Sequence, residues 1–359
     1  MKRKLLRLMH TLGAGHVARF IWRRKLLVLA YHGFLPEEES GDMAPLWGIH
    51  VPAKKFESQL AYLRKYYAPV SLETALSCLE GGRPLPDNAV VITMDDGYRS
   101  VRDIAFPLLL KYEIPATVFL TTGFLDGEAP LWVDRLACAV VQTDRKELAV
   151  NIEGVKLEYD LNGASARQAC VRDLKTRLKT LAHDKLEEML AAVEVDLGGD
   201  NGRRAKLPEP LFPLDWDQVR EMRQSGLMTF GAHTRTHVIL SGCTEEVSGR
   251  EIRHSRLRLE QELQTPCRYF AYPNGGAADH NEISRRVLAA DGFRCAFLTV
   301  PGLVTRGDDL LTLRRVSVLN WMDTAAFALQ ISLVLPALRR QLEQTRPSKG
   351  KVPHVAGCA

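Results

Sequence analysis

The chain has 359 residues, 46% of them apolar, which is enough for one domain of barrel size with a large core. Its net charge is only +5, from 48 basic and 43 acidic residues, so the composition does not indicate nucleic acid as a partner. The seven cysteines are scattered and odd in number, which predicts no disulfide framework. Together with the lack of a convincing signal peptide, this favours a cytoplasmic protein.

The first 25 residues form a basic amphipathic segment, in which eight residues are Lys or Arg, none is acidic, and apolar residues lie between them. Such a segment can lie on an anionic membrane surface, here the inner face of the membrane. The alternative is a solvated cap packed on the bottom of the main domain. Residues 325–338 are the most apolar later stretch, but they are too short to span a bilayer.

Seven short apolar runs predict buried strands, and helical patterns separate them, which is typical of a parallel α/β arrangement. Between residues 130 and 213 the spacing becomes helical amid many charges, which predicts a helical insertion after the third strand. We expect a main domain over residues 26–320, a C-terminal helix over 321–344 and a disordered tail over 345–359. The predicted strands cover residues 26–30, 89–94, 116–120, 229–232, 268–271, 296–298 and 315–318.

Two adjacent carboxylates, Asp95 and Asp96, follow an apolar run in the sequence Thr-Met-Asp-Asp-Gly. Like charges this close cannot both ionise cheaply, so a bound metal or a shared proton is the natural resolution. An Asp-Asp-Gly sequence alone is usually a turn, so the interpretation needs a second group of ligands.

His233 and His237 provide that group, because they follow another short apolar run and their spacing lets two imidazoles face one ion. Two His and one carboxylate suit zinc or a similar divalent ion and leave coordination positions open for water and substrate. A hydrolytic metal site also needs a general base. We assign Asp96, His233 and His237 to the metal and Asp95 to the base.

These motifs resemble the first two motifs of the polysaccharide deacetylase family, the NodB-homology domain of carbohydrate esterase family 4. The resemblance covers about residues 27–318 and includes similar segments at 226–233, 270–275 and 291–296. It implies an irregular (β/α)7 barrel of the NodB-homology type, with the ligands at the carboxyl ends of strands. It also implies the same roles for the metal ligands and the base, and an oxyanion contact from the backbone amide of Tyr272.

Two positions depart from the family pattern. Many members carry an Arg where this chain has Ala271; Arg268 is the nearest basic substitute, and the alternative for Arg268 is an exposed position. The fifth motif, Leu-x-His, supplies a general acid in many members but has no histidine here. His32, after the first predicted strand, is the candidate acid, and its alternative is a structural histidine. The other histidines, His50 among them, lack ligand spacing and are expected in loops or at the surface.

We therefore expect a metal-dependent hydrolase, with zinc as the divalent metal, that removes the N-acetyl group from an amino sugar in a polysaccharide or lipid-linked glycan precursor. One alternative is a deformylase or another C–N amide hydrolase acting on a lipid-linked sugar. The other is a glycan-binding relative without catalysis. The expected partner in each case is an N-acetylated glycan or a lipid-linked amino sugar.

Overall fold

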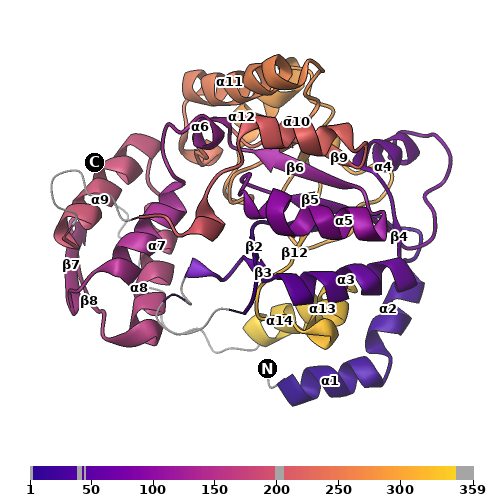
Figure 1. Ribbon diagram of the computed structural model, residues 1–359, viewed down its shortest axis with the longest axis horizontal. Coiled ribbons are helices and arrows are strands. Elements are labelled where there is room, and N and C mark those ends of the chain that lie inside the picture. The colour runs from indigo at the N-terminus through magenta and orange to yellow at the C-terminus, as the bar shows by residue number, and fades with distance from the viewer. Residues whose placement is uncertain (1–2, 39–42, 44–45, 199–205, 345–359) are drawn as a thin grey trace, which may run out of the picture.

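A computed structural model describes residues 3–38, 43, 46–198 and 206–344 of the chain. Its centre is a curled sheet of parallel strands with helices around it (Figure 1). The sheet order is β11-β10-β9-β6-β5-β1-β12, and the short strand β4 pairs with β5. These strands are β1 (Leu27–Tyr31), β4 (Ala68–Pro69), β5 (Ala89–Met94), β6 (Ala116–Leu120), β9 (Met228–Ala232), β10 (Tyr269–Ala271), β11 (Cys295–Phe297) and β12 (Val316–Ser317).

All seven predicted strands are present, each within one residue of its predicted ends. Strands β1, β5 and β6 are buried along their whole length, because successive side chains point alternately into the curl and toward the covering helices. The two ends of the sheet meet where Phe297 of β11 forms a bridge with Leu313, just before β12. The predicted α/β class, with a curled parallel sheet of seven strands, is therefore confirmed.

Helices cover the outer face of the sheet, as connections between parallel strands require. In α3 (Ala53–Tyr66), the buried residues Phe56, Leu60 and Leu63 recur at helical spacing and pack into the main core. The remaining elements of this part are α4 (Leu72–Leu79), the π-helix η2 (Val101–Ala105), α5 (Phe106–Tyr112), α10 (Trp216–Gln224), α11 (Glu245–Leu263), α12 (Glu282–Ala290), the short helices η4 (Leu240–Gly242) and η5 (Leu310–Thr312), and the pair β2 (Phe34–Leu35) and β3 (Val51–Pro52).

The region between β6 and β9 lies to one side of the sheet and has a hydrophobic cluster of its own (Figure 1). Its helices follow the predicted helical spacing, but it also contains an antiparallel hairpin that the sequence analysis missed. The turn residues Glu153 and Gly154 have positive φ angles of 49° and 85°, which suit a tight hairpin turn. The elements are α6 (Thr122–Leu125), α7 (Trp132–Gln142), β7 (Glu147–Ile152), β8 (Val155–Asp160), α8 (Gly163–Leu178), α9 (His183–Asp196) and η3 (Glu209–Leu211).

The C-terminal part forms two helices, α13 (Thr324–Ile331) and α14 (Val334–Gln344), where the sequence analysis predicted one. The break has a local cause, because Leu333 takes a left-handed φ of 65° between them. Pro336 does not interrupt a helix, since it lies in the first turn of α14, where its missing N–H has no helical partner to lose. The predicted tail, 345–359, lies outside the described residues.

The N-terminal segment forms α1 (Arg3–Thr11) and α2 (Ala14–Trp22), which pack beside α13. Leu6 of α1 is buried in the main core, and Gly15 of α2 lies against the Ala328 carbonyl and the Ser332 side chain. None of the described helices is both long enough and apolar enough to cross a membrane.

Arg167 of α8 links parts of the region between β6 and β9. Its guanidinium donates hydrogen bonds to the carbonyl oxygens of Val140 (3.0 Å), Val141, Thr143 (2.9 Å) and Leu161 (3.0 Å), and the residue is only 8% exposed. Val140 and Val141 belong to the last turn of α7, whose carbonyls lack helical partners and favour a positive charge.

Replacement of Arg167 by Met leaves these buried carbonyls without their charged donor, and we expect it to lower the free energy of unfolding by about 3 kcal/mol. Urea denaturation measures the loss, and hydrogen exchange locates it in α7 and α8. The matched control is Arg177→Met on the same helix, which breaks only a partly exposed pair with Asp173 and should cost less than about 0.5 kcal/mol. Equal costs for the two variants would contradict the assigned role.

Candidate metal centre and active site

The two adjacent carboxylates lie where β5 leaves the sheet. The amide of Asp95 still donates to the Tyr31 carbonyl at 3.0 Å, as a sheet residue does. The chain then turns sharply, with φ angles of 77° at Asp96 and 92° at Gly97. The backbone angle at Gly97 favours glycine, and a Cβ there would also crowd the Leu120 side chain at 2.9 Å. This turn points the two carboxylates in different directions.

The two histidines lie in the loop after β9, and hydrogen bonds from the backbone amides of that loop hold it in place. The carboxylate of Glu251, on α11, accepts hydrogen bonds from the amides of Arg235 (3.0 Å) and Thr236 (2.9 Å). His237 takes a left-handed φ of 59°, so its position depends on these contacts. Glu251 is a supporting residue that the sequence analysis missed, because a Glu in a charged helix gives no signal of its target.

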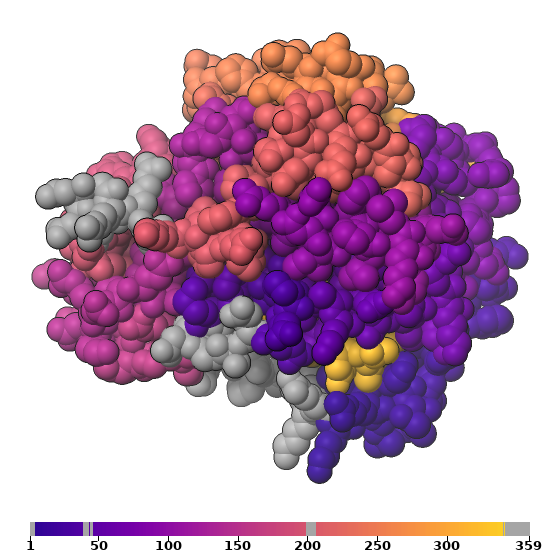
Figure 2. Space-filling view, viewed as in Figure 1, coloured from indigo at the N-terminus to yellow at the C-terminus, as the bar shows by residue number. Residues whose placement is uncertain are grey.

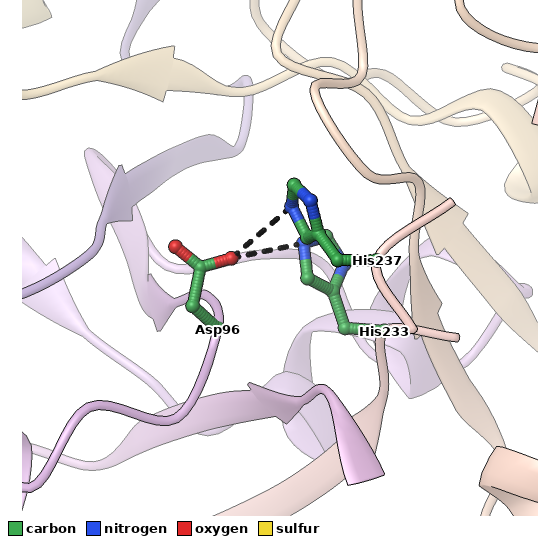
Figure 3. A group of neighbouring side chains, drawn as sticks. All are labelled: Asp96, His233 and His237. Atoms are coloured by element: carbon green, nitrogen blue, oxygen red, sulfur yellow. Dashed lines mark ion pairs between the residues drawn. The ribbon is translucent and has the colours of Figure 1, made fainter. Parts of the chain in front are cut away.

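The structure brings Asp96, His233 and His237 together as predicted (Figure 3). The Nε2 atoms of His233 and His237 lie 3.4 and 3.3 Å from Oδ1 of Asp96, and all three side chains are buried. Nδ1 of His233 lies 2.7 Å from the Ala271 carbonyl, a contact that places the proton on Nδ1 and leaves Nε2 free as a ligand.

These three side chains fit a divalent metal ion. Oδ1 of Asp96 is buried and has no hydrogen-bond partner among the described residues. Burial would raise the pKa of Asp96, but His233 and His237 beside it hold the pKa well below the usual range. Burial also lowers the pKa of His237, which favours the neutral imidazole that binds metals. Two neutral imidazoles and one carboxylate are a donor set that suits zinc and similar ions.

Asp95 has a different partner, the fully buried Arg315. The two guanidinium nitrogens Nη1 and Nη2 donate to the two carboxylate oxygens of Asp95, each at 2.7 Å. Arg315 also donates to Oγ1 of Thr93 (3.0 Å) and to the Leu298 carbonyl (3.1 Å). Burial by itself would raise the pKa of Asp95, but the charge and hydrogen bonds of Arg315, together with the charges of His233 and His32, outweigh it and the pKa is lowered. The carboxylate is therefore ionised and held in one orientation.

Arg315 answers a question that the sequence analysis left open. Arg268, the substitute considered for the missing Arg at position 271, is exposed. The guanidinium instead reaches Asp95 from the residue before β12, on the other side of the curl. A signal was present in the sequence, since Arg315 opens a predicted strand that contains two buried valines, but its target 220 residues away was not readable.

The remaining predicted site residues have mixed outcomes. His32 follows β1, is partly exposed, and interacts electrostatically with Asp95 and Asp96, while its Nδ1 has no described partner. The backbone amide of Tyr272 donates to the Phe297 carbonyl at 3.0 Å in the sheet. That amide is therefore already used, and the structure does not support it as an oxyanion donor.

His50 lies in the loop before β3, as expected, but not at the surface. It is fully buried and packs against the rings of Tyr98 and Trp47, with centroid distances of 4.9 and 5.6 Å. Burial lowers its pKa to about 3, so the imidazole is neutral, and it interacts electrostatically with His32 and Asp96. Gly33 makes this possible, because a Cβ there would lie 2.0 Å from the His50 ring. His50 has no ligand spacing in the sequence, so only the fold reveals its burial beside the site.

The side of the site that faces the insertion carries two more titratable groups, Asp134 and Lys175. The hydroxyl of Tyr98, two residues after Asp96, donates to Oδ2 of Asp134 on α7 at 2.8 Å. Burial raises the pKa of Asp134 to about 7. Lys175 of α8 interacts electrostatically with Asp134 and Asp96, and burial lowers its pKa. The insertion therefore extends the site beyond the metal ligands.

Comparison with known proteins decides the family. The model of the polysaccharide deacetylase family matches residues 82–158 and 164–296, more than half of the chain. The chain belongs to the polysaccharide deacetylase family. The predicted family and enzyme class are thus confirmed.

Individual relatives differ in how much they share with this polysaccharide deacetylase. The protein YxkH of Bacillus subtilis is 22% identical over 309 residues, which cover 86% of this chain and 76% of that protein. The poly-β-1,6-N-acetyl-D-glucosamine N-deacetylase of Escherichia coli K12 is 38% identical, but only over 94 residues, 26% of this chain and 14% of that protein.

Two solved structures share the fold over most of the chain. The deacetylase PplD of Streptococcus pyogenes, in complex with acetate, is 19% identical, with a TM-score of 0.57 over 86% of this chain and 98% of its own. IcaB from Ammonifex degensii is 24% identical, with a TM-score of 0.54 over 85% of this chain and 97% of its own.

Replacement of Arg315 by Met leaves the buried Asp95 carboxylate without its cation, and we expect a loss of about 3–5 kcal/mol in the free energy of unfolding. Adding Asp95→Asn removes the unpaired charge, so the double variant should be more stable than Arg315→Met alone. Urea denaturation at neutral pH of the wild type, both single variants and the double variant measures the coupling. Additive losses would show that the two side chains do not depend on each other.

Asp134 makes a specific contribution to the pH dependence of stability. The folded protein keeps this carboxyl protonated up to about pH 7, whereas the unfolded chain releases the proton near the ordinary pKa of Asp. Between these values the folded state binds more protons, so the contribution of Asp134 to stability falls as pH rises, by up to about 1.4 kcal/mol per pH unit. Asp134→Asn should remove that slope.

Urea denaturation at a series of pH values between the two pKa values tests this expectation. Asp217→Asn, which changes an exposed carboxyl, is the control and should keep the wild-type slope. An unchanged slope in Asp134→Asn would show that the carboxyl is ionised in the folded protein.

Proposed function

We propose that this polysaccharide deacetylase is a metal-dependent N-deacetylase that removes the acetyl group from an N-acetylated amino sugar within a glycan. One observation carries the proposal: two consecutive carboxylates have separate partners, Asp96 with two imidazoles and Asp95 with a guanidinium. One is thereby suited to bind a metal and the other to act as a base. The E. coli and Staphylococcus epidermidis relatives named as poly-β-1,6-N-acetyl-D-glucosamine N-deacetylases support the substrate class.

Asp96, His233 and His237 would hold the ion, for which zinc is the most suitable candidate. A bound divalent ion supplies a Lewis acid that polarises the acetamide carbonyl and lowers the pKa of water. The protein contributes ligands of fixed direction, since the Ala271 carbonyl orients His233 and Glu251 holds the loop before His237.

Asp95 would accept the proton of the attacking water. Arg315 lowers its pKa, so the carboxylate is unprotonated at neutral pH and ready to take a proton. The two hydrogen bonds from Arg315 also fix its plane, while each oxygen keeps a lone pair for the water. Arg315 is a positioning residue, because it acts on the reaction only through Asp95.

His32 would donate a proton to the leaving amine. His32 follows a different strand from the base and is partly exposed, and its electrostatic interactions with Asp95 and Asp96 support this role. Imidazole is the side chain most often used for such a transfer. Nδ1 of His32 is buried without a hydrogen-bond partner among the described residues, which gives the structural role considered as its alternative no support at that atom.

The rest of the glycan would contact the insertion. Lys175 is partly exposed and interacts electrostatically with Asp96, so its ammonium group suits sugar hydroxyls, whereas Tyr98 and Asp134 are buried and hydrogen-bonded to each other. This arrangement fits a substrate longer than one sugar, since a further donor lies beside the reacting centre.

The test is acetate release from N-acetylglucosamine oligomers by wild type reconstituted with zinc, with bound metal measured in parallel. Asp95→Asn should reduce release at least about 100-fold while keeping the metal, because it removes only the base. His233→Ala and His237→Ala should lose the metal. His32→Ala should reduce turnover while keeping both metal and KM.

Three outcomes would contradict parts of the proposal. Equal metal loss in Asp95→Asn and the His variants would remove the assignment of Asp95 as base. Release of formate from N-formylated sugars without acetate release would favour the deformylase alternative. Stoichiometric metal and glycan binding without hydrolysis of either substrate would favour the binding protein.

A further inference from the structure

The N-terminal segment carries most of the large apolar side chains that are exposed among the described residues. Eleven such side chains are exposed in all, and seven of these lie between residues 5 and 22, with exposures from 38% at Trp22 to 75% at Leu12. We call these seven the terminal face: Leu5, Leu8, Leu12, Val17, Phe20, Ile21 and Trp22. Scattered exposed apolar residues are ordinary, but a cluster of this size indicates a binding surface.

The terminal face consists of the outer stripes of two helices that are fixed by their inner sides. Leu5 and Leu8 lie on α1 at helical spacing and Leu12 directly follows that helix, while the buried Leu6 of α1 belongs to the main core. In α2, Phe20 and Ile21 are exposed while Gly15 contacts α13. Both helices thus pack against the protein on one side, and the apolar residues on their opposite side are exposed and available to a partner.

The charge around the terminal face selects the kind of partner. Residues 1–25 contain eight basic residues and no acid, and Lys4 and Arg24 are exposed. The guanidinium of Arg23 lies 4.4 Å from the centre of the Phe20 ring, and the Lys25 ammonium 4.6 Å from that of Trp22. Cations beside exposed aromatic rings suit the boundary between lipid headgroups and acyl chains.

Two other partners for the terminal face, a second copy of the chain and the C-terminal residues of the same chain, carry charge of the same sign. A second copy of the chain would bring the same basic surface against itself. The C-terminal residues 345–359 contain three basic residues and no acid, so they would also add like charge. An anionic lipid surface supplies both the negative charge and the apolar layer that the helices lack.

We propose that α1 and α2 dock the enzyme onto an anionic lipid bilayer, with the terminal face inserted at the level of the headgroups. The active site then faces away from the bilayer. The Arg23 carbonyl, just after α2, accepts a hydrogen bond from the amide of Asn88, immediately before β5, whereas Asp95 and Asp96 follow the other end of that strand. In Figure 2 the N-terminal helices protrude at the lower right, opposite the insertion.

The separation is one strand long, about 20 Å for the six residues of β5. A bound enzyme would therefore act on glycan that extends into the solvent, because a sugar held at the headgroups could not reach the metal ligands on the far end. This consequence rests on the proposed function, but the docking itself does not, and its test needs no activity.

The test is flotation of the full-length protein with vesicles of phosphatidylcholine alone or of phosphatidylcholine mixed with phosphatidylglycerol. We expect binding to the anionic vesicles only, weakened by salt. The variant Phe20→Ser/Ile21→Ser should bind them at least about tenfold less tightly, because two apolar side chains are lost from the inserted layer. Lys4→Gln/Arg24→Gln should weaken binding and its salt dependence together.

The matched control is Leu110→Ser/Leu257→Ser, which removes two exposed apolar side chains elsewhere on the surface and should bind like wild type. Thermal unfolding of each variant confirms that the fold is kept. Three results would overturn the proposal: absence of binding to anionic vesicles at low salt, equal loss in the control variant, or unchanged binding in Phe20→Ser/Ile21→Ser.

Discussion

Two consecutive carboxylates are buried at the end of β5, and the rest of the site is arranged to make that possible. Asp95 and Asp96 are 1% and 3% exposed, so neither can rely on water to stabilise its charge. The left-handed turn at Asp96 and Gly97 sends the side chains to different partners. The charge of Asp95 is paired with the guanidinium of Arg315, and the charge of Asp96 belongs to a set of ligands that suits a divalent cation. The chemistry proposed for the protein follows from this division.

The division depends on the closure of the sheet. Asp95 comes from β5 and Arg315 from the residue before β12, and β1 lies between these strands in the sheet. Thr93 of β5 joins the network, because its hydroxyl donates to the Leu29 carbonyl and accepts from Arg315. The threonine at the start of the Thr-Met-Asp-Asp-Gly sequence therefore has a structural role. It links β5 to β1 and to Arg315 beneath the base. Met94 beside it is buried in the core, as an apolar residue at that position should be.

The sequence predicted what is local and repeated. Strands buried on both faces are continuous apolar runs, so their ends could be placed within one residue, and the ligands follow directly from two of them. The features that the sequence analysis missed depend on tertiary packing. They are the guanidinium that faces Asp95, the burial of His50 behind Gly33, and the hydrogen bond that the amide of Tyr272 makes within the sheet. Arg315 also lies outside the residues that the family model matches.

The position of Arg315 has a consequence for the growing chain. A polypeptide emerging from the ribosome presents both carboxylates and both histidines long before it presents Arg315, because synthesis runs from the N-terminus. Until then Asp95 has no cation, and the curled sheet lacks the strand that brings one. Under the proposed role of Asp95, the base is therefore complete only after Arg315 has been synthesised and β12 has joined the sheet.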